Sequence, residues 1–269
     1  MILQMFSYGF ITRAFIVGAM VSLCAALLGV TLVLKRYSMI GDGLSHVSFG
    51  AMSVAAALNL APLAVSVPVV LAAAFFLLRL SENSKLKGDA AIAVVSSSAL
   101  AIGIIVTSLT TGMNTDVCNY MFGSILAMTK GDVWLSVVLS VFVLIVFVFF
   151  YNKIFAVTFD ESFSRATGVK VGLYNTVIAL LTAVTIVIGM RIMGALLISS
   201  LIIFPALSAM RVCKRFINVM VCAAIISLLC FCGGMFASYV FETPVGAGVV
   251  VIDLAVFGIM SLISKKGRS

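Results

Sequence analysis

Charged side chains are scarce in this sequence. They account for 10% of its 269 residues, whereas hydrophobic residues account for 63% and the mean hydropathy is +1.29. A soluble domain has about a quarter of its residues charged, so a chain of this length could not cover so much apolar surface in water. The shortage of charge therefore excludes an ordinary water-soluble domain and indicates a protein that lies in a lipid bilayer.

Several motifs are also lacking. No glycine-rich loop followed by Lys-Ser or Lys-Thr is present, so we expect no ATP site of that kind. The only histidine is His46, and no nucleophile–histidine–acid set surrounds it in the sequence, so we expect a chain without a catalytic site. The six cysteines lack zinc-finger or redox spacing, which predicts free thiols. We also expect no tightly bound cofactor.

Long apolar runs are abundant. Each covers roughly 17–25 residues, the length of a membrane-spanning helix, whereas barrel strands would have about 10 residues with alternating polarity. The runs predict an all-α integral membrane protein, one domain over residues 1–269, with about nine transmembrane helices, or eight if the sixth and seventh runs are continuous. The predicted spans cover residues 12–34, 41–60, 62–80, 90–110, 133–152, 173–190, 194–210, 216–239 and 246–264.

The positions of the basic residues predict the orientation. With the N-terminus outside and the C-terminus in the cytoplasm, only Arg13, Lys130 and Arg191 of the 17 basic residues face outward. Cytoplasmic loops of membrane proteins carry the excess of lysine and arginine, so this orientation is favoured. The net charge of +8 lies in small groups between apolar runs, and we therefore expect no nucleic-acid partner.

The acidic residues and the histidine that fall within predicted spans are Asp42, Asp253 and His46. An ionisable side chain in hydrocarbon costs several kcal/mol unless it is solvated or paired, so each is a functional candidate. Asp42 and His46 are four residues apart and share one helix face, where both can bind a single ion. A carboxylate and an imidazole suit zinc, manganese or iron, but zinc takes about four ligands. We therefore expect a second copy of the chain to complete a metal site.

Other interpretations stay open for these residues. Asp42 follows Gly41 and could cap a helix N-terminus, and His46 could form a hydrogen bond between helices. Asp253 could line the pathway or pair with a neighbouring polar group. Counted from Arg36, His46 is expected about 15 Å deep in the membrane.

A short helix is predicted in the cytoplasmic connection that follows residue 152. Thr158 and Glu161 fit a capping box, in which both side chains satisfy free N–H groups of the first turn. Gly168 stands where a helix often ends in the left-handed conformation. These signals predict a helix over about residues 159–167.

The sequence resembles the permease subunits of zinc- and manganese-type ABC importers. Four stretches carry the resemblance: Leu34–Gly50, Tyr120–Leu126, Phe159–Gly168 and Met193–Ala209. The first departs at Gly43, where the family usually has alanine, and at residues 48–49, where it often has Leu-Pro. Asp42 and His46 are unchanged, and the matches follow the family's order along nearly the whole chain.

The resemblance implies a function as well as a fold. It implies a homodimeric, multi-pass permease of the bacterial inner or plasma membrane, bound to cytoplasmic ATPase subunits and supplied by an extracytoplasmic metal-binding protein. Asp42 and His46 would pass the cargo, Zn²⁺, Mn²⁺ or Fe²⁺. The segment 159–168 would be the coupling helix, with Asp160, Glu161, Arg165 and Gly168 as candidate coupling residues. An alternative is a secondary metal carrier driven by an ion gradient, with Asp42 and Asp253 as ion sites.

Overall fold

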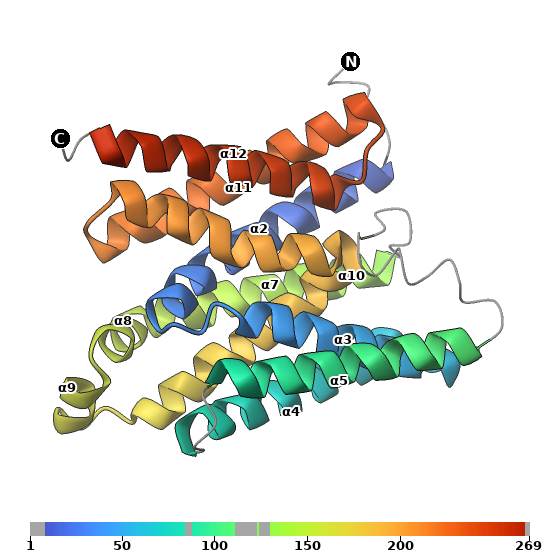
Figure 1. Cartoon of the computed structure of the whole chain (residues 1–269), viewed down its shortest axis with the longest axis horizontal. Helices are drawn as coiled ribbons and strands as arrows, with labels where there is room; N and C mark the ends of the chain where they lie inside the picture. Colours follow the sequence, from blue (N-terminus) through green and yellow to red (C-terminus); the bar gives the residue numbers. More distant parts are fainter. Residues whose placement is uncertain (1–8, 84–87, 111–122, 124–129, 267–269) are drawn as a thin grey trace.

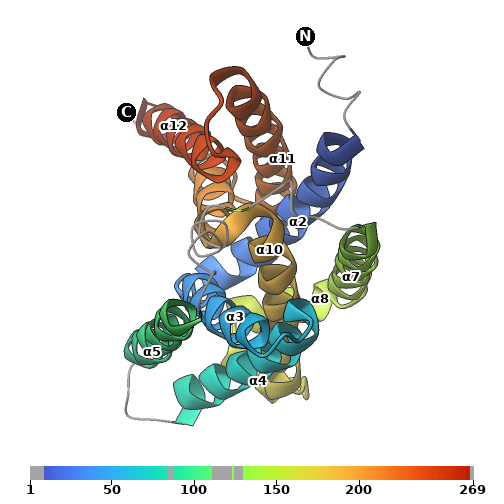
Figure 2. The ribbon, with the colours of Figure 1, turned by 90° about the vertical axis from the view of Figure 1, so that its right-hand side faces the viewer.

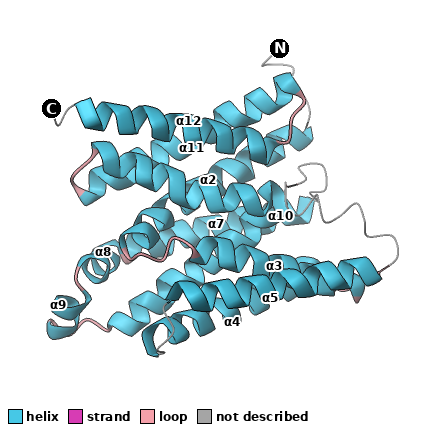
Figure 3. Cartoon of the chain, viewed as in Figure 1, coloured by secondary structure: helices cyan, strands magenta, loops and turns pink. Residues whose placement is uncertain are grey.

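The computed structural model describes residues 9–83, 88–110, 123 and 130–266, and over these residues it contains helices and connections but no strand (Figure 1, Figure 3). The all-α prediction is therefore confirmed for the described part of the chain. The helices are α2 (Gly9–Leu34), α3 (Ile40–Ala57), α4 (Pro62–Asn83), α5 (Gly88–Leu109), α7 (Lys130–Phe149), α8 (Tyr151–Phe159), α9 (Glu161–Ala166), α10 (Val171–Val212), α11 (Phe216–Phe241) and α12 (Val245–Lys266).

Two long helices, α2 and α10, form the centre of the bundle. In the end-on view of Figure 2, α3, α4 and α5 lie on one side of this pair, α11 and α12 lie on the other, and α7 lies at the edge. Large side chains such as Leu28, Leu44, Ile186 and Ile198 are fully buried between these helices. The polar first half of α3 is therefore held against α10, in the interior of the arrangement.

The helix labelled α10 consists of two segments that meet at Gly194, whose φ of 83° and ψ of 163° are not helical. In a straight helix, Gly189 and Ile198 would lie about 13.5 Å apart along the axis. Instead, the Ile198 Cδ1 atom lies 2.5 Å from the position that a Cβ on Gly189 would occupy. The chain thus turns back at Gly194, and the predicted separation of spans 173–190 and 194–210 is confirmed.

Seven described helical segments are long and apolar enough to cross a membrane. They correspond to the predicted spans beginning at residues 12, 90, 133, 173, 194, 216 and 246. The other two predicted spans form helices α3 and α4, but neither meets this criterion: α3 is too polar, and the apolar part of α4 is the shorter stretch Pro62–Leu77. The count of nine transmembrane helices therefore stays a prediction.

The short helix α9 is bounded differently from the sequence prediction. Thr158 does not cap it, because its hydroxyl donates to the carbonyl of Ile154 within α8 at 2.6 Å. Asp160 is the N-cap, and its Oδ1 atom accepts from the backbone N–H of Phe163 at 2.8 Å. The helix therefore begins at Glu161, two residues later than predicted.

The end of α9 follows the prediction. Gly168 has a φ of 82°, its N–H donates to Arg165 O, and the N–H of Val169 donates to Ser164 O. This is a Schellman motif, in which a left-handed glycine lets the last carbonyls find donors. Both ends of α9 are thus capped by the chain itself, which stabilises a helix of only six residues.

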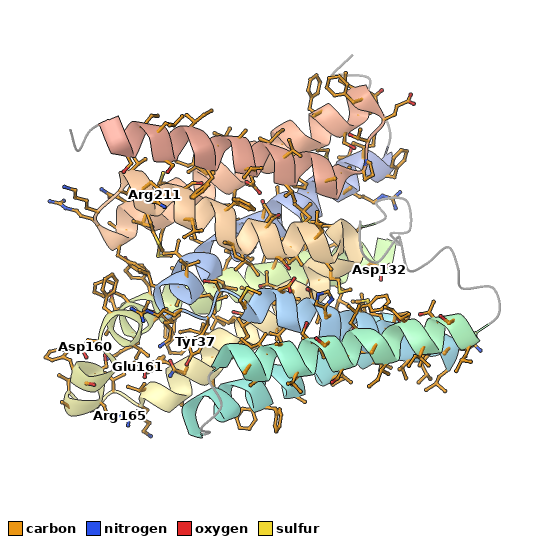
Figure 4. All side chains as sticks on the ribbon, in the orientation of Figure 1. Tyr37, Asp132, Asp160, Glu161, Arg165 and Arg211 are labelled. Carbon is orange, nitrogen blue, oxygen red and sulfur yellow. The ribbon has the colours of Figure 1, made fainter. Side chains whose placement is uncertain are left out.

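The two ends of the bundle differ. In Figure 1 the C-terminus of α12 lies at the same end as α8 and α9, whereas α2 begins at the opposite end. Figure 4 places Arg211 and Arg165 at the α9 end and Asp132 at the other. This arrangement is compatible with the predicted orientation, which puts α9 and the C-terminus on one side of the membrane. The stretch Tyr120–Leu126 lies outside the described residues except for Gly123.

Candidate functional site

The first half of α3 presents a narrow polar strip. From Ile40 to Gly50 every residue is buried except Asp42 and His46. The Asp42 side chain is 42% exposed and that of His46 is 21% exposed, and the Asp42 Oδ2 atom lies 3.6 Å from the His46 Nε2 atom. The i, i+4 spacing therefore brings the predicted pair together on the face of this half of α3 that the described residues leave open.

A third polar group reaches the strip from α10. The Ser199 hydroxyl lies 3.4 Å from the Asp42 Oδ1 atom and 3.0 Å from the carbonyl of Ala195 in its own helix. A hydroxyl has one proton and two lone pairs, so Ser199 donates either to the Asp42 carboxylate or to the Ala195 carbonyl, and its lone pairs stay available to an ion beside it. The site of one chain therefore has a carboxylate, an imidazole and a hydroxyl.

Glycines set the close approach of α10 to this site. A Cβ on Gly29 of α2 would lie 2.0 Å from the backbone oxygen of Ile202, and a Cβ on Gly41 would lie 3.0 Å from the Ile202 Cδ1 atom. Ile202 therefore fits between two helices at positions where neither has a side chain. Since Ser199 is one turn earlier on the same face of α10, this fit determines how near its hydroxyl lies to Asp42.

Two sequence interpretations of α3 are wrong. The helix begins at Ile40 with Met39 as the N-cap, so Asp42 does not cap it and instead lies in the first turn. The straight-helix count from Arg36 to His46 also fails, because Arg36 has a φ of 61° and the chain turns before α3 starts; the depth of His46 in the membrane stays a prediction. Counted from Ile40, His46 lies about 9 Å along the helix axis.

No pattern in the sequence marks Ser199 as a site residue. It is 157 residues from Asp42 along the chain, and one serine among many in an apolar run is no signal of its own. Within the described residues, no group of three or more His, Cys, Asp and Glu side chains could hold a metal ion. Within the described residues, the pair of Asp42 and His46 is thus smaller than the set of about four ligands that zinc takes.

Asp253 lies elsewhere in the bundle. It is in α12, which packs against α10 and α11, and it is 1% exposed. Within the described residues, neither carboxylate oxygen has a partner at ordinary hydrogen-bond geometry, but the Cys230 thiol of α11 is close enough to interact with the carboxylate. The structure does not bring Asp253 together with Asp42 and His46, and its place in a metal pathway stays a prediction.

The residues of the predicted coupling segment face in different directions. Asp160 caps α9, whereas Arg165 is exposed on its surface beside a hollow of about 460 Å³ that Glu161, Ser162 and Ala166 also line. The Glu161 Oε1 atom instead accepts from Lys35 Nζ at 2.5 Å. Figure 4 shows Asp160, Glu161 and Arg165 together at one end of the bundle. The acidic residue that begins α9 is thus joined to the membrane-spanning part of the chain.

The described chain has seven helical segments that are apolar enough to cross a membrane. An ionisable pair on a polar helix among them is typical of a membrane transport protein. The chain belongs to the ABC 3 transport family, whose sequence profile matches residues 7–264. This membership confirms the resemblance to metal ABC importer permeases and does not favour the alternative of a gradient-driven carrier.

Individual relatives cover almost the whole chain. It is 25% identical to the manganese transport system membrane protein MntC of Halalkalibacterium halodurans, over 98% of this chain and 90% of that one. It is 28% identical to the high-affinity zinc uptake system membrane protein ZnuB of Haemophilus influenzae, over 94% and 97%. The solved structure of PsaBC from Streptococcus pneumoniae in complex with Fab has a similar fold, with a TM-score of 0.86, 26% identity, and coverage of 97% and 95%.

Proposed function

We propose that this chain is the membrane-spanning subunit of an ATP-driven importer of divalent transition-metal ions, with Mn²⁺ and Zn²⁺ as the first candidates and Fe²⁺ as a third. The main support is the pair of Asp42 and His46, whose Oδ2 and Nε2 atoms are 3.6 Å apart on the exposed face of α3. The names of the relatives, which transport manganese or zinc, support the same cargo.

A second copy of the chain completes the metal site in this proposal. A half-exposed carboxylate facing lipid would be costly, so the strip must face water or protein. One chain offers Asp42, His46 and the Ser199 hydroxyl, whereas zinc takes about four ligands and manganese prefers six with much oxygen. Two strips facing each other across a dimer axis would supply six side chains and form a water-accessible path between them.

The ATPase would dock on α9, which we place on the cytoplasmic side. Phe163 projects from α9 with 66% of its surface exposed. An exposed aromatic side chain on a rigid helix is the kind of anchor that fills a pocket on a partner protein. Arg165 is also exposed on α9 and would add charge complementarity.

The transport cycle then follows from alternating access. An extracytoplasmic binding protein delivers the ion at the end opposite α9, in a bacterial plasma membrane. ATP binding on the partner subunit moves α9, the helices rearrange, and the ion passes the Asp42–His46 strip to the cytoplasm. The chain itself forms no covalent bond with its cargo, and ATP hydrolysis takes place on the ATPase subunit.

Substitution of both strip residues tests this function. Asp42→Asn and His46→Gln remove the charge and the imidazole while keeping nearly the same volume. Reconstituted with its ATPase and binding protein, each variant should retain the complex but lose metal uptake by about a hundredfold or more, since only two of the strip's ligands are left per chain. Glu242→Gln, which alters an exposed carboxylate at the end of α11, is the matched control. Wild-type uptake in both strip variants would refute the proposal.

A further inference from the structure

The C-terminal end of α2 is joined to the α8–α9 corner by Lys35. Its side chain is only 5% exposed, and its Nζ atom donates to the carbonyl of Val157 at 3.2 Å and to Glu161 Oε1 at 2.5 Å. A buried ammonium group needs partners for its charge and its protons, because water cannot supply them. Lys35 is therefore bound to α8 and α9 and is not free on the surface.

Glu161 connects a third element to the same point. Its Oε1 atom also accepts from Asn175 Nδ2 in the first part of α10, at 3.2 Å. Burial raises the pKa of the Glu161 carboxyl, but the hydrogen bond and charge of Lys35, with help from Asn175 and Arg165, outweigh it, and the pKa is lowered overall. The carboxylate is therefore charged at neutral pH, and it holds the start of α9 against both α2 and α10.

On its C-terminal side, Lys35 is followed by a turn that leads into α3 and its polar strip. The turn after Lys35 is short and hydrogen-bonded: the N–H of Tyr37 donates to Leu32 O at 2.8 Å, and the N–H of Ile40 donates to Tyr37 O at 3.0 Å. Asp42 follows in the first turn of α3. Because this turn is short and held by hydrogen bonds, a displacement of Lys35 would also move α3, which carries Asp42 and His46.

We propose that Lys35 is a positioning residue that couples movement of α9 to α3, through its contact with Glu161. The inference rests on the proposed function, in which the ATPase acts on α9. Pulling the two residues apart would leave the buried Lys35 charge with only the Val157 carbonyl as a partner, so α9 and the α2–α3 turn move together. Without the contact, α9 can move with the ATPase while Asp42 and His46 on α3 stay in place.

The test measures metal uptake per ATP hydrolysed, with the complete complex of permease, ATPase and binding protein in proteoliposomes. Lys35→Met keeps most of the side-chain length but removes the charge, and Glu161→Gln keeps the shape of the acid. In both variants we expect uptake per ATP to fall by about tenfold while ATPase activity persists. A larger loss is not expected, because Glu161 is partly exposed and its ion pair with Lys35 is weaker than a fully buried pair. Lys35→Arg should retain the wild-type ratio.

Lys153→Met is the matched control, since Lys153 is an exposed lysine of α8 at the same end of the bundle. An unchanged ratio in Lys35→Met and Glu161→Gln would overturn the inference. A parallel loss of uptake and ATPase activity in both, or a failure of both to assemble, would also overturn it, since either result indicates a purely structural contact. If the wild-type complex takes up no metal, the proposed function fails and not this coupling step alone.

Discussion

Replacing Gly29 by alanine should disturb both the packing of the bundle and its metal site. The new Cβ would lie 2.0 Å from the backbone oxygen of Ile202, at the contact between α2 and α10. Ordinary contact needs about 3.5 Å, so α10 must retreat by about 1.5 Å. A backbone atom cannot swing aside as the tip of a side chain can, and the whole turn of helix must therefore move.

The destabilisation by Gly29→Ala is best measured against a matched substitution in α12. Gly258→Ala introduces the same methyl group in a helix, but nothing lies within 4 Å of it. Both variants gain roughly 0.5–1 kcal/mol from the lower chain entropy of alanine, so their difference isolates the clash, which should cost about 1–3 kcal/mol. For a chain of this size, Gly29→Ala should then unfold about 2–12 °C below Gly258→Ala.

The same shift should reach the site. Ser199 is one turn from Ile202, and its hydroxyl is already 3.4 Å from Asp42 Oδ1, so a retreat of about 1.5 Å removes it from hydrogen-bonding range. Thermal unfolding of the purified protein in detergent and concentration-dependent metal uptake measure the two effects. Equal unfolding temperatures for the two variants, with unchanged uptake by Gly29→Ala, would refute the packing of α10 described above.

Three other substitutions probe separate contacts. Ser199→Ala should weaken the apparent metal affinity in uptake assays by about fivefold, the equivalent of about 1 kcal/mol. Ser200→Ala should not, because the Ser200 hydroxyl donates to Leu197 within its own helix. Equal effects of the two substitutions would count against a role for Ser199. Gly43→Ala places a Cβ 2.6 Å from Ile92 Cγ2, so Ile92→Ala should be less harmful in its presence, by about 1 kcal/mol in a double-mutant cycle of unfolding; strict additivity would contradict this contact. Phe163→Ala should reduce co-purification of the ATPase by about tenfold, whereas Phe241→Ala, which removes another well-exposed ring at the end of α11, should not. An undiminished yield with Phe163→Ala would place the docking surface elsewhere.

Long apolar runs made the helices predictable from the sequence. The chain turn at Gly194 agrees with the division placed there, because a glycine between two apolar runs permits a backbone that other residues avoid. The cap of α9 was harder, since Thr158 and Asp160 are both good capping residues. The choice depends on Ile154, whose carbonyl takes the threonine hydroxyl within α8.

The site was only partly predictable for a different reason. Asp42 and His46 are close in sequence, so helix geometry alone places them on one face. Ser199 and Lys35 contact their partners across 157 and 126 residues. Such contacts depend on how α10 fits against glycines of α2 and α3, and on where α8 turns into α9. No local pattern contains that information.

The polarity of α3 has a consequence for how the protein is made. Asp42, His46 and three serines keep this helix below the apolarity of the seven candidate spans, although its neighbours bury most of it. An isolated segment of this composition would partition poorly into lipid during synthesis. We expect α3 to enter the bilayer only when α2 and α4 accompany it, so the residues that handle the cargo make membrane insertion a cooperative event.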